Sequence, residues 1–113
     1  MILHPDVAKA LQLSLPVVAL ESAVITHGLP HPINLELAQH LEDVIRQNGA
    51  APATIALLEG ELHIGITNEE LQSLAAASNP VKISRRDFAP AMTQKRTGGT
   101  TVAGTMIAAH RAG

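Results

Sequence analysis

A short apolar run that ends in a carboxylate constrains the fold of this chain more than any other feature. Residues 16–20 are proline followed by aliphatic residues, and Glu21 comes directly after them. Continuous runs of this kind are typical of strands buried in an α/β sheet. Open α/β sheets place reacting groups just beyond such strands. The pattern therefore predicts a strand that presents Glu21 at its carboxyl end, either as a reacting group or as a partly solvated residue that merely ends the strand.

Apolar periodicity and turn residues divide the rest of the chain into alternating helices and strands. Helices are predicted at residues 5–13, 34–47, 67–78 and 102–110, and strands at residues 16–20, 53–58, 61–66 and 81–84. The Glu59-Gly60 pair predicts a hairpin between two of the strands, and the alternation predicts a largely parallel sheet. The expected fold class is α/β, in a single domain of 113 residues.

The predicted helix at residues 34–47 has the clearest local signals. Asn34 suits an N-cap, and Gly49 suits the left-handed conformation that often ends a helix. Its apolar positions are expected to face the core, namely Leu37, Ala38, Leu41, Val44 and Ile45. The following helix begins with Thr67-Asn-Glu-Glu70, which has the spacing of a capping box.

The composition excludes several classes of function. Phe88 is the single aromatic residue and the net charge is −2, so the stacking surfaces and basic grooves of nucleic-acid-binding proteins are absent. The chain has no cysteine, which excludes thiolate catalysis. No signal peptide is visible, and no apolar run approaches the roughly 20 residues of a membrane helix. We therefore expect a cytoplasmic protein with neither a nucleic-acid nor a membrane partner.

Basic side chains lie in and after the predicted strand at residues 81–84. Lys82 is placed either to contact a phosphate or carbonyl group near the end of the strand, or to face solvent. Arg85 and Arg86 form either an anion clamp or surface salt bridges, for example with Asp87. The sequence leaves both interpretations open.

The segment Thr97-Gly-Gly-Thr-Thr101 is predicted to be a loop ahead of the last helix. Its glycines allow close backbone approach, and its hydroxyls and the helix N-terminal amides can hold an anion. The alternative is a tight turn in which Thr100 or Thr101 caps the helix. These two interpretations are evenly balanced.

The histidines give weaker signals. His27 and His31 follow Glu21 and are candidates for orienting a substrate, with His27 also placed to help a proton transfer. No pair of histidines has the spacing of a helical metal site, so no metal ligands are expected within this segment. Ser22 lacks the Gly-x-Ser-x-Gly context of a hydrolase nucleophile.

Four motifs in order resemble the pseudouridine-5'-phosphate glycosidases, also called the indigoidine synthase A family. They are VALESAVITHGLP at residues 18–30, GAAPATIA at 49–56, KISRRD at 82–87 and GGTTVA at 98–103. The resemblance implies reversible cleavage of the C–C glycosidic bond of pseudouridine 5'-phosphate, giving uracil and ribose 5-phosphate, in pseudouridine degradation. It also implies an α/β/α fold, a manganese cofactor and a homotrimer.

The resemblance also implies roles for individual residues. Glu21 matches the proton donor of the family, which supplies the proton that the base carbon gains. The implied substrate-binding residues are Lys82, Val102, Thr100 and Thr101. Two positions depart from many relatives, which have threonine in place of Ala23 and often alanine in place of Gly104. Neither departure removes a named catalytic group.

Family members continue well beyond 113 residues. Their later part carries the lysine that forms an imine with ribose and the aspartate that holds manganese, and Lys95 does not match that lysine motif. Moreover, the last predicted helix has a broad apolar surface with no strand after it, which suggests an incomplete domain. Residues 1–113 are thus expected to be the N-terminal part of one domain, inactive alone. The alternative is a truncated, inactive phosphosugar-binding or subunit-interaction module.

Overall fold

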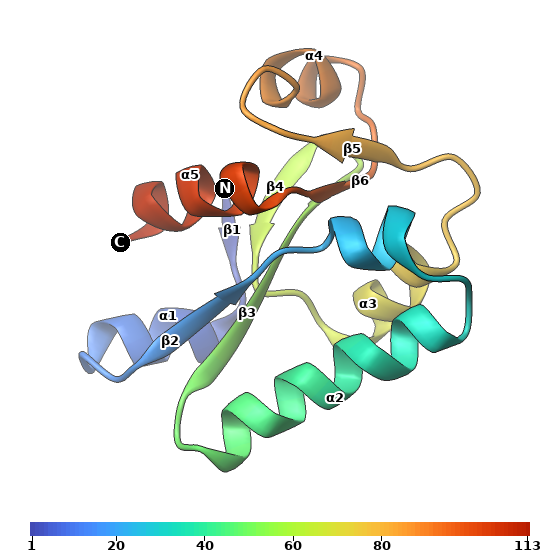
Figure 1. Ribbon diagram of the computed structural model, residues 1–113. Helices are drawn as coiled ribbons and strands as arrows, with labels where there is room; N and C mark the ends of the chain where they lie inside the picture. Colours follow the sequence, from blue (N-terminus) through green and yellow to red (C-terminus); the bar gives the residue numbers. More distant parts are fainter.

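The strand β3, Ala51–Leu58, lies within a six-stranded sheet and carries much of the core (Figure 1). The computed structural model describes every residue of the chain, 1–113. Residues 53–57 of β3 are all buried, in agreement with their largely aliphatic sequence. Both faces of this strand are therefore covered, as is usual for an inner strand of an α/β sheet.

The other five strands bring distant parts of the chain together. They are β1 (Ile2–Leu3), β2 (Val17–Leu20), β4 (Glu61–Ile64), β5 (Val81–Ile83) and β6 (Gly98–Thr100). On one side of β3, β4 pairs antiparallel, and β1 pairs parallel with β4. On the other side, β2 pairs parallel with β3, whereas β6 pairs antiparallel with β3 and parallel with β5. The predicted mostly parallel sheet with a hairpin is confirmed, with one further antiparallel pairing through β6.

Strands β2 and β6 share one edge of β3 and approach each other from opposite directions. Leu20, the last residue of β2, pairs with Thr54, and Gly99 of β6 pairs with Ala56. Because β2 runs parallel to β3 and β6 runs antiparallel to it, their carboxyl ends meet beside Ile55. This junction joins the segment after β2 to the segment after β6.

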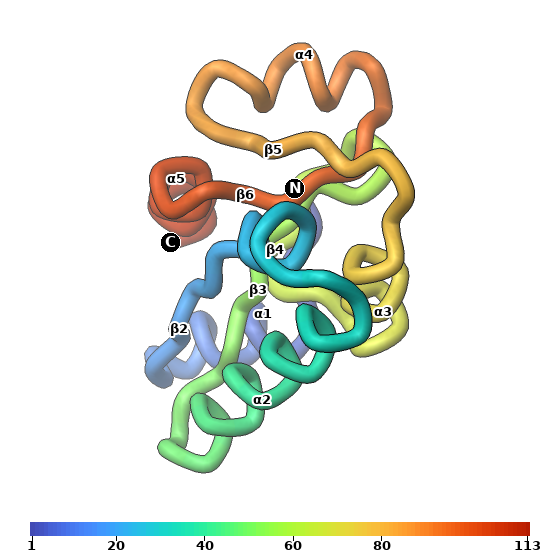
Figure 2. Tube along the Cα trace, turned by 45° about the vertical axis from the view of Figure 1, so that its right-hand side comes forward, coloured from blue at the N-terminus to red at the C-terminus, as the bar shows by residue number.

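Helices cover both faces of the sheet and create three layers (Figure 2). One face carries α1 (Pro5–Gln12), α4 (Phe88–Thr93) and α5 (Val102–Ala112), and the other carries α2 (Ile33–Gln47), α3 (Asn68–Ala75) and the π-helical turn η1 (Val24–Gly28). Ile55 and Leu57 pack in the first core cluster, and Ala56 packs in the second. The α/β/α architecture is therefore confirmed.

Several local sequence signals are confirmed. Gly49, just after α2, has a φ of +84°. The Thr67 hydroxyl accepts a hydrogen bond from the Glu70 N–H at 3.1 Å, and the Glu70 carboxylate accepts one from the Thr67 N–H at 2.7 Å. The capping box that begins α3 is thus complete. No helix in the chain is both long enough and apolar enough to cross a membrane.

The prediction that Asn34 caps α2 is wrong. Helix α2 already begins at Ile33, and the buried Asn34 side chain donates hydrogen bonds to the carbonyl oxygens of Ile25 and Ala75, both at 2.9 Å. An amide with two donors can join two separate backbone segments in this way. Asn34 therefore ties α2 to η1 and to the end of α3.

The predicted core face of α2 is wrong in part. Ala38 is buried as expected, but Leu41 and Val44 are 37% and 39% exposed. Glu42 is buried instead, and its carboxylate accepts hydrogen bonds from the Thr54 hydroxyl at 2.6 Å and from Arg46 at 3.0 Å. These partners offset the cost of burying the charge. A polar contact with β3 thus determines the rotation of α2.

The loop predicted at residues 97–101 is also wrong in part, because Gly98–Thr100 form β6. All three residues of β6 are buried. A β carbon on Gly99 would lie 2.5 Å from the Ser22 carbonyl oxygen and would also contact the Thr26 hydroxyl. Glycine is therefore required by the close approach of η1 to the sheet. The short elements β1 and α4 were likewise not predicted.

Candidate functional site

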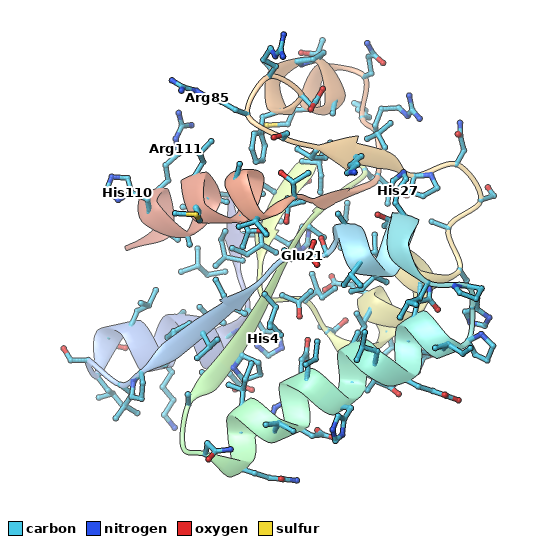
Figure 3. The ribbon with its side chains drawn as sticks, in the orientation of Figure 1. His4, Glu21, His27, Arg85, His110 and Arg111 are labelled. Carbon is cyan, nitrogen blue, oxygen red and sulfur yellow. The ribbon has the colours of Figure 1, made fainter.

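Glu21 lies directly after β2, as the sequence predicts, at the junction with β6. Its Oε2 atom accepts a hydrogen bond from the Val24 N–H at 3.3 Å, so the carboxylate bends back toward η1. The residue is partly exposed. Figure 3 shows Glu21 between η1 and the start of α5. The carboxylate is thus held by the backbone and remains accessible.

Two buried hydroxyl groups fill the junction between β2 and β6. The hydroxyls of Ser22 and Thr100 both donate to the Ile55 carbonyl oxygen, at 2.5 Å and 2.8 Å. The Ser22 oxygen also accepts a hydrogen bond from the Thr100 N–H at 2.8 Å. The side chains thereby satisfy backbone groups where the two strands end. This role of Ser22 was not predicted from the sequence, in which the available signal was a hydroxyl residue close to the end of a strand.

The position of Thr100 corrects one predicted substrate contact. Thr100 is 0% exposed. Its hydroxyl donates a hydrogen bond to the Ile55 carbonyl oxygen and also lies 2.8 Å from the Thr105 hydroxyl. The Thr100 side chain therefore holds the end of β6 and the first turns of α5 together. It has no surface left for contact with a substrate.

Thr101 caps α5, as one interpretation of the sequence predicts. Its hydroxyl accepts a hydrogen bond from the Gly104 N–H at 3.1 Å and lies 3.2 Å from the Ser84 hydroxyl, beyond β5. Val102 is the first residue of α5 and is 64% exposed. The N-terminus of a helix attracts anions through its free N–H groups and dipole. This helix start lies close to Glu21 because Ser22 and Thr100 are hydrogen-bonded.

Lys82 is exposed, and the pairing of β5 with β6 indicates which face it occupies. It is aligned with Gly99 across the parallel ladder, so both residues are directed to the same face of the sheet. Gly99 faces Ser22 and Thr26, and the Lys82 side chain therefore leaves the sheet on the face that η1 covers. Lys82 therefore lies on the same face of the sheet as η1, whose first residue, Val24, donates a hydrogen bond to Glu21.

The two candidate histidines are exposed. His27 belongs to η1, and its Nδ1 atom lies 2.6 Å from the Thr26 hydroxyl. His31 lies in the turn between η1 and α2. Short π-helical segments occur frequently at functional sites. His27 thus lies in the same turn as Val24, whose N–H contacts Glu21, whereas His31 lies beyond that turn.

The residues of this chain do not form a site for a manganese ion. No group of three or more histidine, cysteine, aspartate or glutamate side chains is arranged to hold a metal. The candidate groups are instead the carboxylate of Glu21, the ammonium group of Lys82 and the N-terminus of α5. These groups suit proton transfer and the binding of an anion.

Replacing Thr101 with alanine is expected to lower the free energy of unfolding by about 1 kcal/mol, the usual cost of losing an N-cap hydroxyl. Thr101→Ser keeps the hydroxyl and should retain most of the stability. Urea denaturation followed by circular dichroism measures both variants. An equal loss in the two variants would show that the methyl group, and not the cap, stabilises the helix start.

The fold and this junction define a three-layer α/β/α protein with a carboxylate directly after a strand. The chain belongs to the family described as "Indigoidine synthase A like protein", whose model matches residues 6–113. The pseudouridine-5'-phosphate glycosidase 1 of Rhizobium johnstonii is 56% identical over 108 residues, which cover 96% of this chain and 34% of that protein. The enzyme of Mycoplasmopsis agalactiae is 47% identical, over 96% of this chain and 36% of that protein. The chain thus spans about a third of the length of these curated relatives.

Solved structures agree with this assignment. The prealnumycin C-glycosynthase AlnA, crystallised with ribulose 5-phosphate, superimposes with a TM-score of 0.84 at 39% identity, over 97% of this chain and 35% of that one. An indigoidine synthase A-like protein from Thermotoga maritima gives a TM-score of 0.79 at 29% identity, over 86% of this chain and 33% of that one. The order of the strands and helices around Glu21 is therefore that of the family.

Proposed function

We propose that this chain supplies the proton donor and part of the phosphate-binding surface of a pseudouridine-5'-phosphate glycosidase. The reaction is the reversible cleavage of the C–C glycosidic bond of pseudouridine 5'-phosphate to uracil and ribose 5-phosphate. The main supporting observation is the junction of β2 and β6, which brings Glu21 close to the N-terminus of α5. The names of the curated relatives support the choice of substrate.

In this proposal Glu21 donates a proton, and a separate set of groups binds the phosphate. As the bond between the base and the ribose breaks, the base carbon gains a proton, and Glu21 is the donor on this face. The N–H groups at the start of α5 and the Lys82 ammonium group bind the phosphate. Val102 contributes its backbone N–H, because its aliphatic side chain offers no polar contact.

The proposal extends to a cytoplasmic homotrimer that uses manganese. Its support is the family resemblance alone. The imine-forming lysine and the manganese ligand are proposed to come from the part of the family fold that residues 1–113 do not cover.

A chimeric enzyme tests this function directly. Residues 1–113 replace the matching segment of the Rhizobium johnstonii relative, and uracil release from pseudouridine 5'-phosphate is measured by chromatography with manganese present. We expect the chimera to turn over and the 113-residue chain alone to release no uracil, because positioned covalent catalysis needs its nucleophile in place. A folded but inactive chimera would contradict the enzyme function. Turnover by the chain alone would contradict the division of labour proposed here.

A non-catalytic phosphosugar-binding module is the second candidate, because the exposed Lys82 and the start of α5 offer anion contacts that do not depend on Glu21. Binding of ribose 5-phosphate by the isolated chain, together with an inactive chimera, would support the module. Calorimetric titration of the chain and of its Lys82→Gln variant measures this binding.

A further inference from the structure

A groove between α4 and α5 lies outside the candidate site and combines basic and apolar walls. Its volume is about 740 Å³, within the range of small-molecule pockets. It is lined by Met1, Leu62, Arg85, Arg86, Phe88, Ala89, Met92, Ile107, Ala108 and Arg111. None of these residues is Glu21, Lys82, Thr101 or Val102.

The basic wall is formed by Arg85, Arg86 and Arg111, which come from two separate segments. Both Arg85, from the segment before α4, and Arg111, from the last turn of α5, line the groove, and Figure 3 shows their side chains extending to the same side of the molecule. No lining residue is acidic, and none of the three arginines forms a salt bridge. The neighbouring Asp87 carboxylate accepts a hydrogen bond from the Ser84 N–H at 2.8 Å. The three positive charges therefore have no carboxylate partner within the chain.

The apolar wall has a different chemistry. Phe88, the single aromatic residue of the chain, lies in this wall, and the adjacent Met92 is 40% exposed. Leu62 and Ile107 supply further aliphatic surface. An aromatic ring and a polarisable thioether provide a favourable surface for a flat apolar group.

We infer that this groove is a second binding site, which takes a small organic anion with an aromatic or apolar body. The guanidinium groups bind the anionic end, because their planar donors match phosphate and carboxylate oxygens. The body of the ligand lies against Phe88 and Met92. The inference is independent of the proposed function, since the groove and the Glu21 site share no residue.

Phenyl phosphate is the probe, because it carries one phosphate group on one ring. Binding is followed by NMR titration of the 113-residue chain, with the arginine side-chain resonances resolved. We expect saturable shifts at Arg85, Arg86, Phe88 and Arg111. The dissociation constant for phenyl phosphate should be at least about tenfold lower than the constants for inorganic phosphate and phenol, because only phenyl phosphate uses both walls.

Variants separate this groove from other basic surfaces. Arg85→Gln and Arg111→Gln should each weaken phenyl phosphate binding by about tenfold, the usual effect of losing one charged hydrogen bond. Lys9→Gln on the exposed side of α1 removes the same charge and should change binding by less than about twofold, because exposed distant charges are screened. Met92→Glu introduces a carboxylate into the apolar wall, and this variant should fold but show no saturable binding of phenyl phosphate.

Three outcomes would overturn the inference. The first is the absence of saturable shifts in the groove. The second is loss of binding in the Lys82→Gln, Thr101→Ala double variant, which would place the phosphate at the candidate active site instead. The third is a dimer in analytical ultracentrifugation whose interface buries the groove, because a second copy would then be its occupant.

Discussion

Replacing Gly99 with alanine should lower the free energy of unfolding by at least about 2 kcal/mol, which corresponds to a fall of about 8 °C in Tm for a domain of 113 residues. The added methyl group would lie 2.5 Å from the Ser22 carbonyl oxygen and would also contact the Thr26 hydroxyl. Because one of these contacts is with backbone, a change of side-chain rotamer alone cannot relieve it. The turn η1 must move away from β6. Thermal unfolding followed by circular dichroism measures the effect.

Gly28→Ala is the matched control, since it adds the same methyl group within η1. The nearest atom there belongs to the Val24 side chain, at 3.1 Å, so a small shift accommodates it. We expect a change of less than about 1 kcal/mol. Equal destabilisation by the two substitutions would contradict the close packing of η1 against β6 as the cause.

Glu21→Gln in the chimeric enzyme is expected to lower the turnover number by about 10²–10⁴, the usual contribution of a positioned general acid. Glutamine has nearly the same shape and preserves an acceptor for the Val24 N–H, but it has no acidic proton to donate. KM should change little, because Glu21 is not one of the proposed phosphate contacts. Steady-state uracil release and single-turnover kinetics measure the two effects.

Glu36→Gln serves as the control, because Glu36 is an exposed carboxylate in the first turn of α2. It should leave turnover within about twofold of the unsubstituted chimera, since it touches no group at the junction. Near-normal single-turnover cleavage by Glu21→Gln would refute the role of proton donor. A large rise in KM with an unchanged turnover number would assign Glu21 to substrate binding instead.

Features that depend on a few neighbouring residues could be predicted from the sequence. The strand before Glu21, the hairpin at Glu59-Gly60 and the capping box at Thr67 are all present. Each depends on apolar periodicity or on the backbone preferences of turn and cap residues. The helix at α2 was predicted for the same reason, but its orientation was not. Side-chain partners on other elements, such as Thr54 for Glu42, determined which face is buried.

The candidate site divides in a similar way. The sequence indicated Glu21 at a strand end and a helix start near Thr101, and both are present. The prediction of a loop at Gly98–Thr100 was wrong, because a segment of three residues with two glycines has a low strand propensity although it forms β6. Two neighbouring strands, β3 and β5, pair with this segment and override that propensity. Thr100 is consequently buried in the fold, and Thr101 remains at the helix N-terminus.

Local sequence patterns were sufficient to predict the α/β class, the placement of Glu21 directly after a strand and the family to which the chain belongs, although no residue of that strand is fully buried. These properties follow from apolar patterning and from motifs that are contiguous along the chain. Three other features are evident only in three dimensions: β2 and β6 meet end to end beside Ile55, Ser22 and Thr100 are hydrogen-bonded at this junction, and Arg85 and Arg111 line one groove. Ser22 and Thr100 are 78 residues apart in the chain. Contacts at such separations depend on strand order and close packing, which local residue preferences do not specify.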